Sequence, residues 1–368
     1  MPLKGLSGSL SFVSFLDKLK FHQKSSNEEV RILTYITNLP SNDLFESMTR
    51  FGFKVEYLGE IVQVSIQDPN SDGQDGDVQP SIYYCYHDTQ RSLLLCFTYD
   101  TIEEAIKKMD KFVNQRRGIA PIWIHPLTFD KIRKQILERY PKTLIVEFHA
   151  SRVRREREEA VLREQYQDRY FQYNGDDGRH TLDEISRSYG VLPHSIVFVI
   201  PNLAKFRITN KGKFTFNHGE IEVLFEIINE LLSEFLERKK IIDRAKAEFI
   251  PMNFGKGEVK VPHVIPVDIV FSREVEFLEV QKLIDNMGGD DFNFEIFDTL
   301  LIQGSVHLSG TVIDKNKNTG FNITCNSDRV TLSPTKDTPF DSLMQFYKMI
   351  TERLDLNARV ELSPGITG

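Results

Sequence analysis

Cysteine is scarce in this 368-residue chain: only Cys85, Cys96 and Cys325 occur, and no two of them stand in a CxxC spacing. Three such thiols cannot form a disulfide framework, so we expect them to be reduced. Apolar runs are also short, the longest being Leu93–Phe97 and Ile196–Ile200, whereas a bilayer-spanning helix needs about 20 apolar residues. Because the first residues lack a sustained apolar segment as well, we expect a soluble, cytoplasmic protein without a membrane anchor.

Diagnostic catalytic motifs are missing too. The sequence contains no GxSxG, no phosphate-binding GxxxxGK[ST], no HExxH and no spaced Cys/His set for zinc. A Ser/His/Asp triad stays open, because its members can lie far apart in sequence. No cofactor is predicted, and whether the protein is an enzyme is left open.

Charge is unevenly distributed along the chain, whose net charge is −7. Lys and Arg outnumber Asp and Glu only in residues 119–262, by 24 to 21, whereas the two flanking thirds are acidic. Nucleic-acid binding needs cations gathered on one surface. Any such contact is therefore expected in the middle third.

Hydrophobic periodicity and turn residues predict an α+β fold with mostly antiparallel sheets. The order β-α-β(3-4)-α is predicted three times, giving modules at residues 1–118, 119–250 and 266–362. Residues 251–265, with several prolines and glycines, are predicted as a linker, and 363–368 as a loose tail. The second module carries a helical, arginine-rich insertion at residues 151–193.

This order of elements resembles the repeat of the TATA-box-binding-protein-like fold, in which a curved antiparallel sheet carries two helices on one face. The resemblance covers most of the chain by element order and involves no shared residue motif. It implies sheet modules with their helices on one side, and no particular activity.

The insertion holds the candidate binding residues. Residues 151–170 contain six Arg, four Glu and one Asp. A self-paired, solvated helix is one interpretation; contact with nucleic acid or an acidic protein partner is the other, because the planar guanidinium suits phosphate and carboxylate. Nearby tyrosines could stack on single-stranded bases. The predicted contact residues are Arg152, Arg154, Arg155, Arg157, Arg163, Arg169, Tyr170 and Tyr173.

Acidic residues crowd the far end of the insertion. An EF-hand fails there, because Tyr173 and Gly175 would occupy ligand positions. Asp176, Asp177 and His180 are weak candidates for a divalent metal, and the alternative is a turn leading into a helix. No metal site is assigned.

One further pair, Glu147 and His149, alternates along a predicted strand and so points to one side of it. The pair is either catalytic or part of an exposed strand face.

Two functions follow from these observations. The first is a non-enzymatic binding or scaffold subunit of a multi-subunit assembly, for which a bacterial defence or mobile-element system is one context. It would contact nucleic acid or an acidic protein through the insertion. The alternative is a metal-dependent nuclease or phosphoesterase that uses acids of the insertion.

Overall fold

The computed structural model describes residues 9–26, 28–66, 80–152, 170–253, 258–285, 287, 292–302 and 306–363. Two compact units divide the chain: unit 1 comprises Met1–Val113 and Ile119–Phe235, and unit 2 comprises Asn114–Gly118 and Leu236–Gly368. Both contain helices packed on antiparallel sheets, which confirms the α+β class. Within the described ranges, none of the helices has the length and apolar character needed to cross a bilayer.

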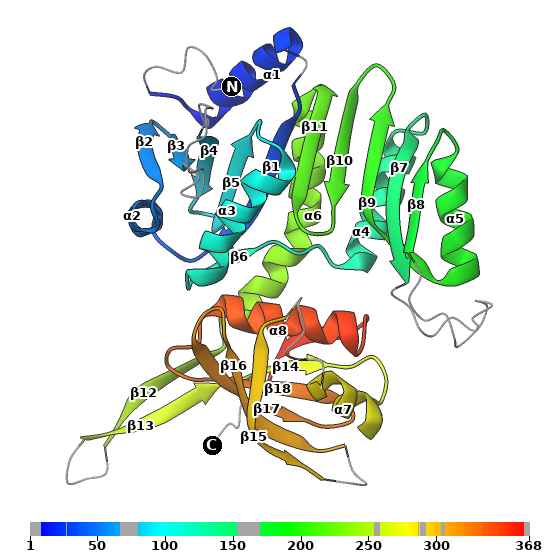
Figure 1. The fold of residues 1–368 in the computed structure, drawn as a ribbon. Helices are drawn as coiled ribbons and strands as arrows, with labels where there is room; N and C mark the ends of the chain where they lie inside the picture. The colour runs from blue at the N-terminus through cyan, green and yellow to red at the C-terminus, as the bar shows by residue number, and fades with distance from the viewer. Residues whose placement is uncertain are drawn as a thin grey trace, which may run out of the picture. The chain divides into compact units, whose positions relative to one another are not determined.

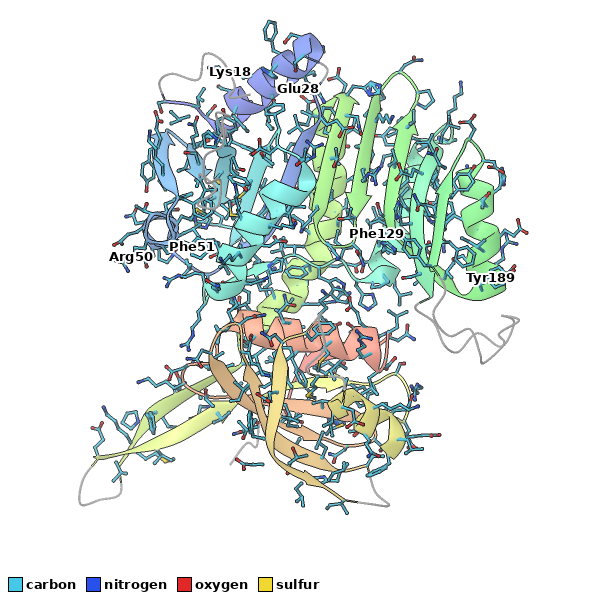
Figure 2. The ribbon with its side chains drawn as sticks, viewed as in Figure 1. Lys18, Glu28, Arg50, Phe51, Phe129 and Tyr189 are labelled. Atoms are coloured by element: carbon cyan, nitrogen blue, oxygen red, sulfur yellow. The ribbon has the colours of Figure 1, made fainter. Side chains whose placement is uncertain are left out.

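The first half of unit 1 is built around strand β1. Its elements are α1 (Phe12–Ser26), β1 (Val30–Thr37), α2 (Ser41–Phe51), β2 (Lys54–Leu58), β3 (Ile61–Ile66), β4 (Ser81–Asp88), β5 (Leu93–Thr98) and α3 (Ile102–Gln115). Helix α2 ends at Gly52, whose φ of 107° is the left-handed geometry that glycine tolerates. The Phe51 ring of α2 lies 5.4 Å from the Phe112 ring of α3, so the two helices share one core (Figure 2).

The second half of unit 1 continues the same sheet. Its elements are β6 (Ile119–Pro121), α4 (Pro126–Arg139), β7 (Leu144–Arg152), β8 (Tyr170–Asn174), α5 (Gly178–Tyr189), β9 (Val191–Ile200), β10 (Ala204–Thr209), β11 (Lys213–Gly219) and α6 (Ile221–Ile242). The described strands form an 11-stranded sheet in the order β2-β3-β4-β5-β1-β11-β10-β9-β7-β8, with β6 beside β1. Strand β1 pairs with β5 and with β11, so the first two predicted modules share one sheet.

The helices α3 and α6 lie on opposite faces of this sheet. Cys96 of β5 belongs to the core cluster that contains Phe112 of α3. The next residue, Phe97, has its ring 5.2 Å from Phe15 of α1 and 6.1 Å from Phe225 of α6. Because neighbouring residues of a strand point to opposite faces, α1 and α6 cover the face opposite α3 (Figure 1).

The second half of the sheet leaves its α3-side face without a helix among the described residues. A row of paired residues crosses β1, β11, β10, β9 and β7 on that side: Arg31, Thr215, Arg207, Val197 and Glu147. Helices α4 and α6 lie behind these strands in Figure 1, and α5 lies at the edge of the sheet beside β8. We call the α3-side surface of β7 to β11 the open face.

Unit 2 contains a hairpin and a second sheet. The hairpin strands are β12 (Lys246–Asn253) and β13 (Glu258–Ile265), so the stretch predicted as a linker holds the end of β12 and all of β13. The other elements are β14 (Val267–Val270), α7 (Phe277–Asp285), β15 (Phe294–Leu301), β16 (Leu308–Asp314), β17 (Thr319–Cys325), β18 (Arg329–Pro334), α8 (Phe340–Arg353) and β19 (Arg359–Leu362). Six of these strands pair in the order β15-β16-β17-β18-β14-β19.

A buried ion pair lies inside unit 2, between the β16–β17 turn and α8. Lys317 Nζ is 2.9 Å from Asp341 Oδ2, and the two side chains are 5% and 0% exposed. Lys317 Nζ also donates to the Arg116 carbonyl at 2.5 Å, and the Gly118 amide donates to Asp341 Oδ1 at 3.1 Å. Burial raises the pKa of Asp341 despite the opposing charge of Lys317.

Candidate functional site

The open face carries a cluster of polar and aromatic side chains on β7 to β10. Glu147 and His149 of β7 point to this face, whereas Phe148 and Ala150 between and beyond them are buried on the other. The pairing of β7 with β9 shifts register between Ile145 and Glu147, and such irregularities re-aim strand side chains. Beyond that shift, Glu147 and His149 face one side of β7, as predicted, and the buried Phe148 faces the other.

A chain of three side chains runs from Glu147 to a tyrosine on the neighbouring strand β8. His149 Nε2 lies 3.2 Å from Glu147 Oε1, and His149 Nδ1 is hydrogen-bonded to the Tyr170 hydroxyl. When neutral His149 carries its proton on Nε2, it donates to the carboxylate and accepts the Tyr170 O–H at Nδ1. The arrangement is carboxylate, imidazole, hydroxyl, and Tyr170 at its end is 60% exposed.

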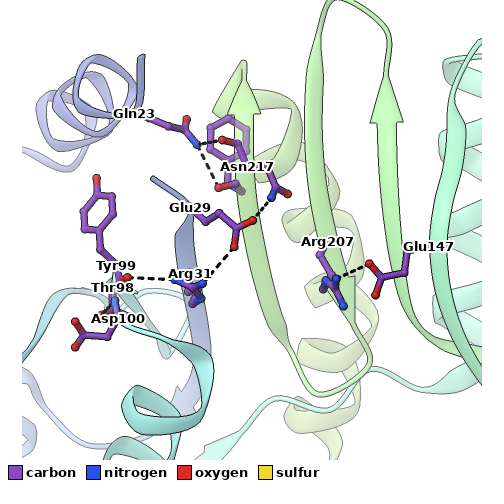
Figure 3. A network of polar contacts seen from close by, with 10 residues as sticks. Gln23, Glu29, Arg31, Thr98, Tyr99, Asp100, Glu147, Arg207 and Asn217 are labelled. Atoms are coloured by element: carbon purple, nitrogen blue, oxygen red, sulfur yellow. Dashed lines mark hydrogen bonds and ion pairs between the residues drawn. The ribbon is translucent and has the colours of Figure 1, made fainter. Parts of the chain in front are cut away.

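Arg207 of β10 fixes the carboxylate from the other side. Its guanidinium donates to Glu147 Oε2 at 2.8 Å, so each oxygen of Glu147 has a partner. Figure 3 shows Arg207 and Glu147 pointing toward each other from β10 and β7. An arginine–carboxylate hydrogen bond is charge-assisted, which restricts the carboxylate to one orientation.

His194 of β9 completes the aromatic part of the cluster. Its ring centroid lies 6.0 Å from that of His149 and 5.7 Å from that of Tyr170. Burial, followed by the charges of His149 and Lys211, lowers the pKa of His194 to about 4. The His194 ring is therefore neutral near pH 7 and packs against Tyr170 as an uncharged aromatic surface.

Further cations line the same face. Arg31 of β1 lies in the same row as Arg207, at the border of the open face, and donates to Glu29 at 3.2 Å (Figure 3). Lys213 of β11 contacts Asp110 of α3 at 2.7 Å. Lys205 lies two residues before Arg207 on β10 and so shares its face, and it has no ion pair within the described part of the chain. The open face thus combines cations, most of them paired, with the exposed Tyr170 ring and two half-buried imidazole rings.

The sequence-predicted contact residues separate into two groups. Arg154, Arg155, Arg157, Arg163 and Arg169 lie outside the described residues. Arg152 is the last residue of β7, and its side chain is likewise outside the described set.

The two predicted tyrosines, by contrast, are described, and they face opposite sides of β8. Tyr170 joins the cluster on the open face. Tyr173 stacks on Phe148 with a centroid distance of 5.0 Å, and its hydroxyl donates to Asp177. Only Tyr170 therefore presents its ring to the open face.

The acidic end of the insertion forms the start of helix α5. Asp177 is the N-cap residue, and Asp176 and His180 are exposed. Helix α5 begins at Gly178, directly after these two aspartates. Asp183 pairs instead with buried Arg133 at 2.8 Å. Among the residues that the structure describes, no group of three or more His, Cys, Asp or Glu side chains is placed to hold a metal ion.

Sequence reasoning missed Arg207 and His194. Both lie on strands that are distant in sequence from Glu147, and their approach depends on the register of β7 with β9 and of β9 with β10. The one available signal was alternation on β10, where Lys205, Arg207 and Thr209 form a polar row opposite buried Phe206 and Ile208.

Comparisons with known proteins cover this site. Residues 128–211 match the model of the AF_0896_M family middle domain. The whole chain is also similar to a protein of Archaeoglobus fulgidus described as "Uncharacterized protein", at 19% identity over 360 residues, which is 95% of each chain. The matched middle-domain segment contains Glu147, His149, Tyr170, His194 and Arg207, so the whole cluster falls within it.

Proposed function

We propose that this protein is a nucleic-acid-binding subunit that holds a single strand on the open face of unit 1. The observation that carries the proposal is the exposed Tyr170 ring, which is linked to Arg207 through His149 and Glu147, on a sheet face without a helix in the described residues. Flat sheet surfaces suit extended single strands, because bases stack on aromatic rings while cations contact the backbone.

The modest charge of the open face favours a single strand over a duplex. Arg31, Arg207 and Lys213 each have an acidic partner, which leaves Lys205 as a cation without an ion pair in the described residues. A duplex-binding surface normally neutralises several phosphates with unpaired cations. With Lys205 unpaired, and with Arg207 and Lys213 shared with their acidic partners, we expect this face to contact about two or three phosphates. The arginines of residues 152–169 are predicted to add to them.

We also infer that the chain is built from repeats with the TATA-binding-protein-like order, the second of which carries the arginine-rich insertion. In support, β1 to α3 and β14 to α8 have the same element order. Their sheet orders, β2-β3-β4-β5-β1 and β15-β16-β17-β18-β14, correspond strand for strand. In the middle repeat, β8 pairs only with β7 at the end of the sheet path, as an added strand would.

The proposal is tested by fluorescence anisotropy with labelled 15-nucleotide single strands of DNA and RNA and with the matching duplex. Three phosphate contacts predict a log–log salt slope of about −2 for single strands. Tyr170→Ala should weaken binding about tenfold, because a stacked base contributes about 1–3 kcal/mol.

Two control variants are matched to these residues. Tyr57→Ala removes a ring of 61% exposure on β2, at the other end of the sheet. Lys205→Ala removes a cation from the open face and should weaken binding. Its control is Lys134→Ala, which removes a cation of 61% side-chain exposure from α4. Binding that is lost equally in controls and test variants, or no binding at low salt, overturns the proposal and leaves a protein partner for the open face.

A further inference from the structure

Glu147, His149 and Tyr170 have the geometry of an activated nucleophile. In such sites the nucleophile contacts a base by a hydrogen bond, and a third group orients the base. Here the Tyr170 hydroxyl contacts His149 Nδ1, and Glu147 lies 3.2 Å from His149 Nε2. We infer that Tyr170 attacks a phosphodiester of the bound single strand and forms a phosphotyrosine link. This inference rests on the proposed binding function and adds a reaction to it.

The orientation of each member supports a reactive role for Tyr170. Arg207 holds the second oxygen of Glu147 at 2.8 Å, so the carboxylate faces His149. The neighbouring Tyr173 provides a contrast, because its ring stacks on Phe148 and its hydroxyl donates directly to a carboxylate without an intervening imidazole. Of the two tyrosines of β8, only Tyr170 combines an exposed ring with a base at its hydroxyl.

The reaction balances without a further reactant. His149 Nδ1 takes the proton of the Tyr170 hydroxyl as the phenolate oxygen bonds to phosphorus. The bond from phosphorus to the 5′-bridging oxygen of the strand breaks. In an in-line displacement that oxygen lies opposite the attacking phenolate, so it takes a proton from water, and the His149 imidazolium afterwards returns its proton to water. The strand is cut, with one end attached to Tyr170 and the other carrying a free hydroxyl. Because a phenolate leaves more readily than an alkoxide, a free hydroxyl can reverse the step and rejoin or transfer the strand.

Arg207 supports the reaction by holding the Glu147 carboxylate. A guanidinium has five N–H donors, and among the described residues Arg207 uses one of them, toward Glu147. Two strands, β9 and β7, separate β10 from the strand β8 that carries Tyr170, so Arg207 acts on the reaction through Glu147. Glu147 acts only through His149, so it is a positioning residue rather than a catalytic one.

The test uses the full chain and a 15-nucleotide single strand, as DNA and as RNA, with one internal 5′-bridging phosphorothiolate. Sulfur leaves readily and the released thiol attacks poorly, so a covalent adduct accumulates. Wild-type protein should gain the mass of the attached fragment, mapped to Tyr170 by peptide mass spectrometry. Tyr170→Phe should abolish the adduct, and His149→Ala should slow its formation about 10²–10⁴-fold. Tyr57→Phe, on the other end of the sheet, should form it at the wild-type rate.

Two further measurements separate the reaction from binding and from folding. Tyr170→Phe keeps the aromatic ring, so it should bind the strand within about threefold of wild type by anisotropy. Added imidazole should restore part of the adduct formation in His149→Ala, which a purely structural role of His149 would not produce. Binding by wild type without any adduct overturns the nucleophile and leaves the binding function standing. Cleavage that persists in Tyr170→Phe also overturns it, and absence of binding removes both proposals.

Discussion

Removing Lys317 should test how the buried ion pair of unit 2 contributes to stability. In Lys317→Met, the carboxylate of Asp341 stays fully buried and keeps backbone hydrogen bonds, among them the one from the Gly118 amide. Breaking a buried ion pair on one side typically destabilises a protein by about 3–5 kcal/mol. A second route limits this loss, because Asp341 can take up a proton. From an ordinary pKa near 3.8, protonation at pH 7 costs about 4 kcal/mol.

This second route makes the effect depend on pH. In Lys317→Met, the folded-state pKa of Asp341 is expected to lie above its unfolded value. The protonated form therefore stabilises the fold at low pH, and that stability is lost as the pH rises. We expect the free energy of unfolding of Lys317→Met to lie below that of wild type by about 3–4 kcal/mol at pH 7 and by only about 1.5–2 kcal/mol at pH 5. The difference arises because each pH unit changes the free energy needed to protonate Asp341 by about 1.4 kcal/mol.

The measurement is urea unfolding by circular dichroism at both pH values, with hydrogen exchange of the β16 to β18 amides to assign the change to unit 2. Lys317→Met/Asp341→Asn removes both charges and keeps an acceptor for Gly118, so it should recover most of the loss and show no extra pH dependence. Lys315→Met, in the same turn, breaks an exposed pair with Glu295 and should change stability by less than about 1 kcal/mol. A loss below 1 kcal/mol, or one that is equal at pH 5 and pH 7, refutes the reasoning.

Three other predictions concern unit 1 and the thiols. The lowered pKa of His194, about 4, means that its stabilising contribution is present above pH 6.5 and is lost as the pH falls toward 4. Between pH 7 and pH 4.5, the free energy of unfolding of wild type should therefore fall by about 1–2 kcal/mol more than that of His194→Asn, a figure reduced for the partial exposure of His194. If urea unfolding gives parallel pH profiles for the two proteins, the prediction is wrong. Gly212→Ala should destabilise by about 2–3 kcal/mol, because φ is +65° and the new Cβ would lie 2.7 Å from the Ile122 carbonyl. Gly52→Ala is the control: its φ is +107°, but no atom lies within 4 Å of the new Cβ, so it should destabilise by about 1 kcal/mol. Equal melting temperatures for Gly212→Ala and Gly52→Ala would show that the contact with the Ile122 carbonyl has no effect. All three thiols are buried, and burial raises the pKa of Cys325 to about 12, so reaction with Ellman's reagent should require unfolding.

Local structure was predictable from the sequence where local chemistry determines it. Glycine and short polar residues are local signals for helix ends and turns, and the structure has a helix end at Gly52 and a turn at Asp314–Asn318. Alternation on β7 also placed Glu147 and His149 on one side of their strand. Each of these features depends on residues within a few positions of one another.

Long-range pairing was not predictable in the same way. The pairing of β1 with β11 joins residues about 185 positions apart, and no local pattern specifies such a partner. The same applies to the site, because Arg207 reaches Glu147 only through the registers of β10 with β9 and of β9 with β7. Residues 251–265 were predicted as a linker because prolines such as Pro251 and Pro262 argue against a central strand. In the structure both prolines lie in the two-stranded hairpin β12–β13, where proline is tolerated.

The central position of β1 has a consequence for dissecting the protein. Each long edge of this strand is hydrogen-bonded, to β5 on one side and to β11 and β6 on the other. A fragment that stops before Ile119 would leave one row of β1 amides and carbonyls bare along an apolar strand, which is a template for self-association. The two halves of unit 1 are thus expected to be soluble only as one piece, and fragments intended for binding or activity assays should keep residues 9–235 together.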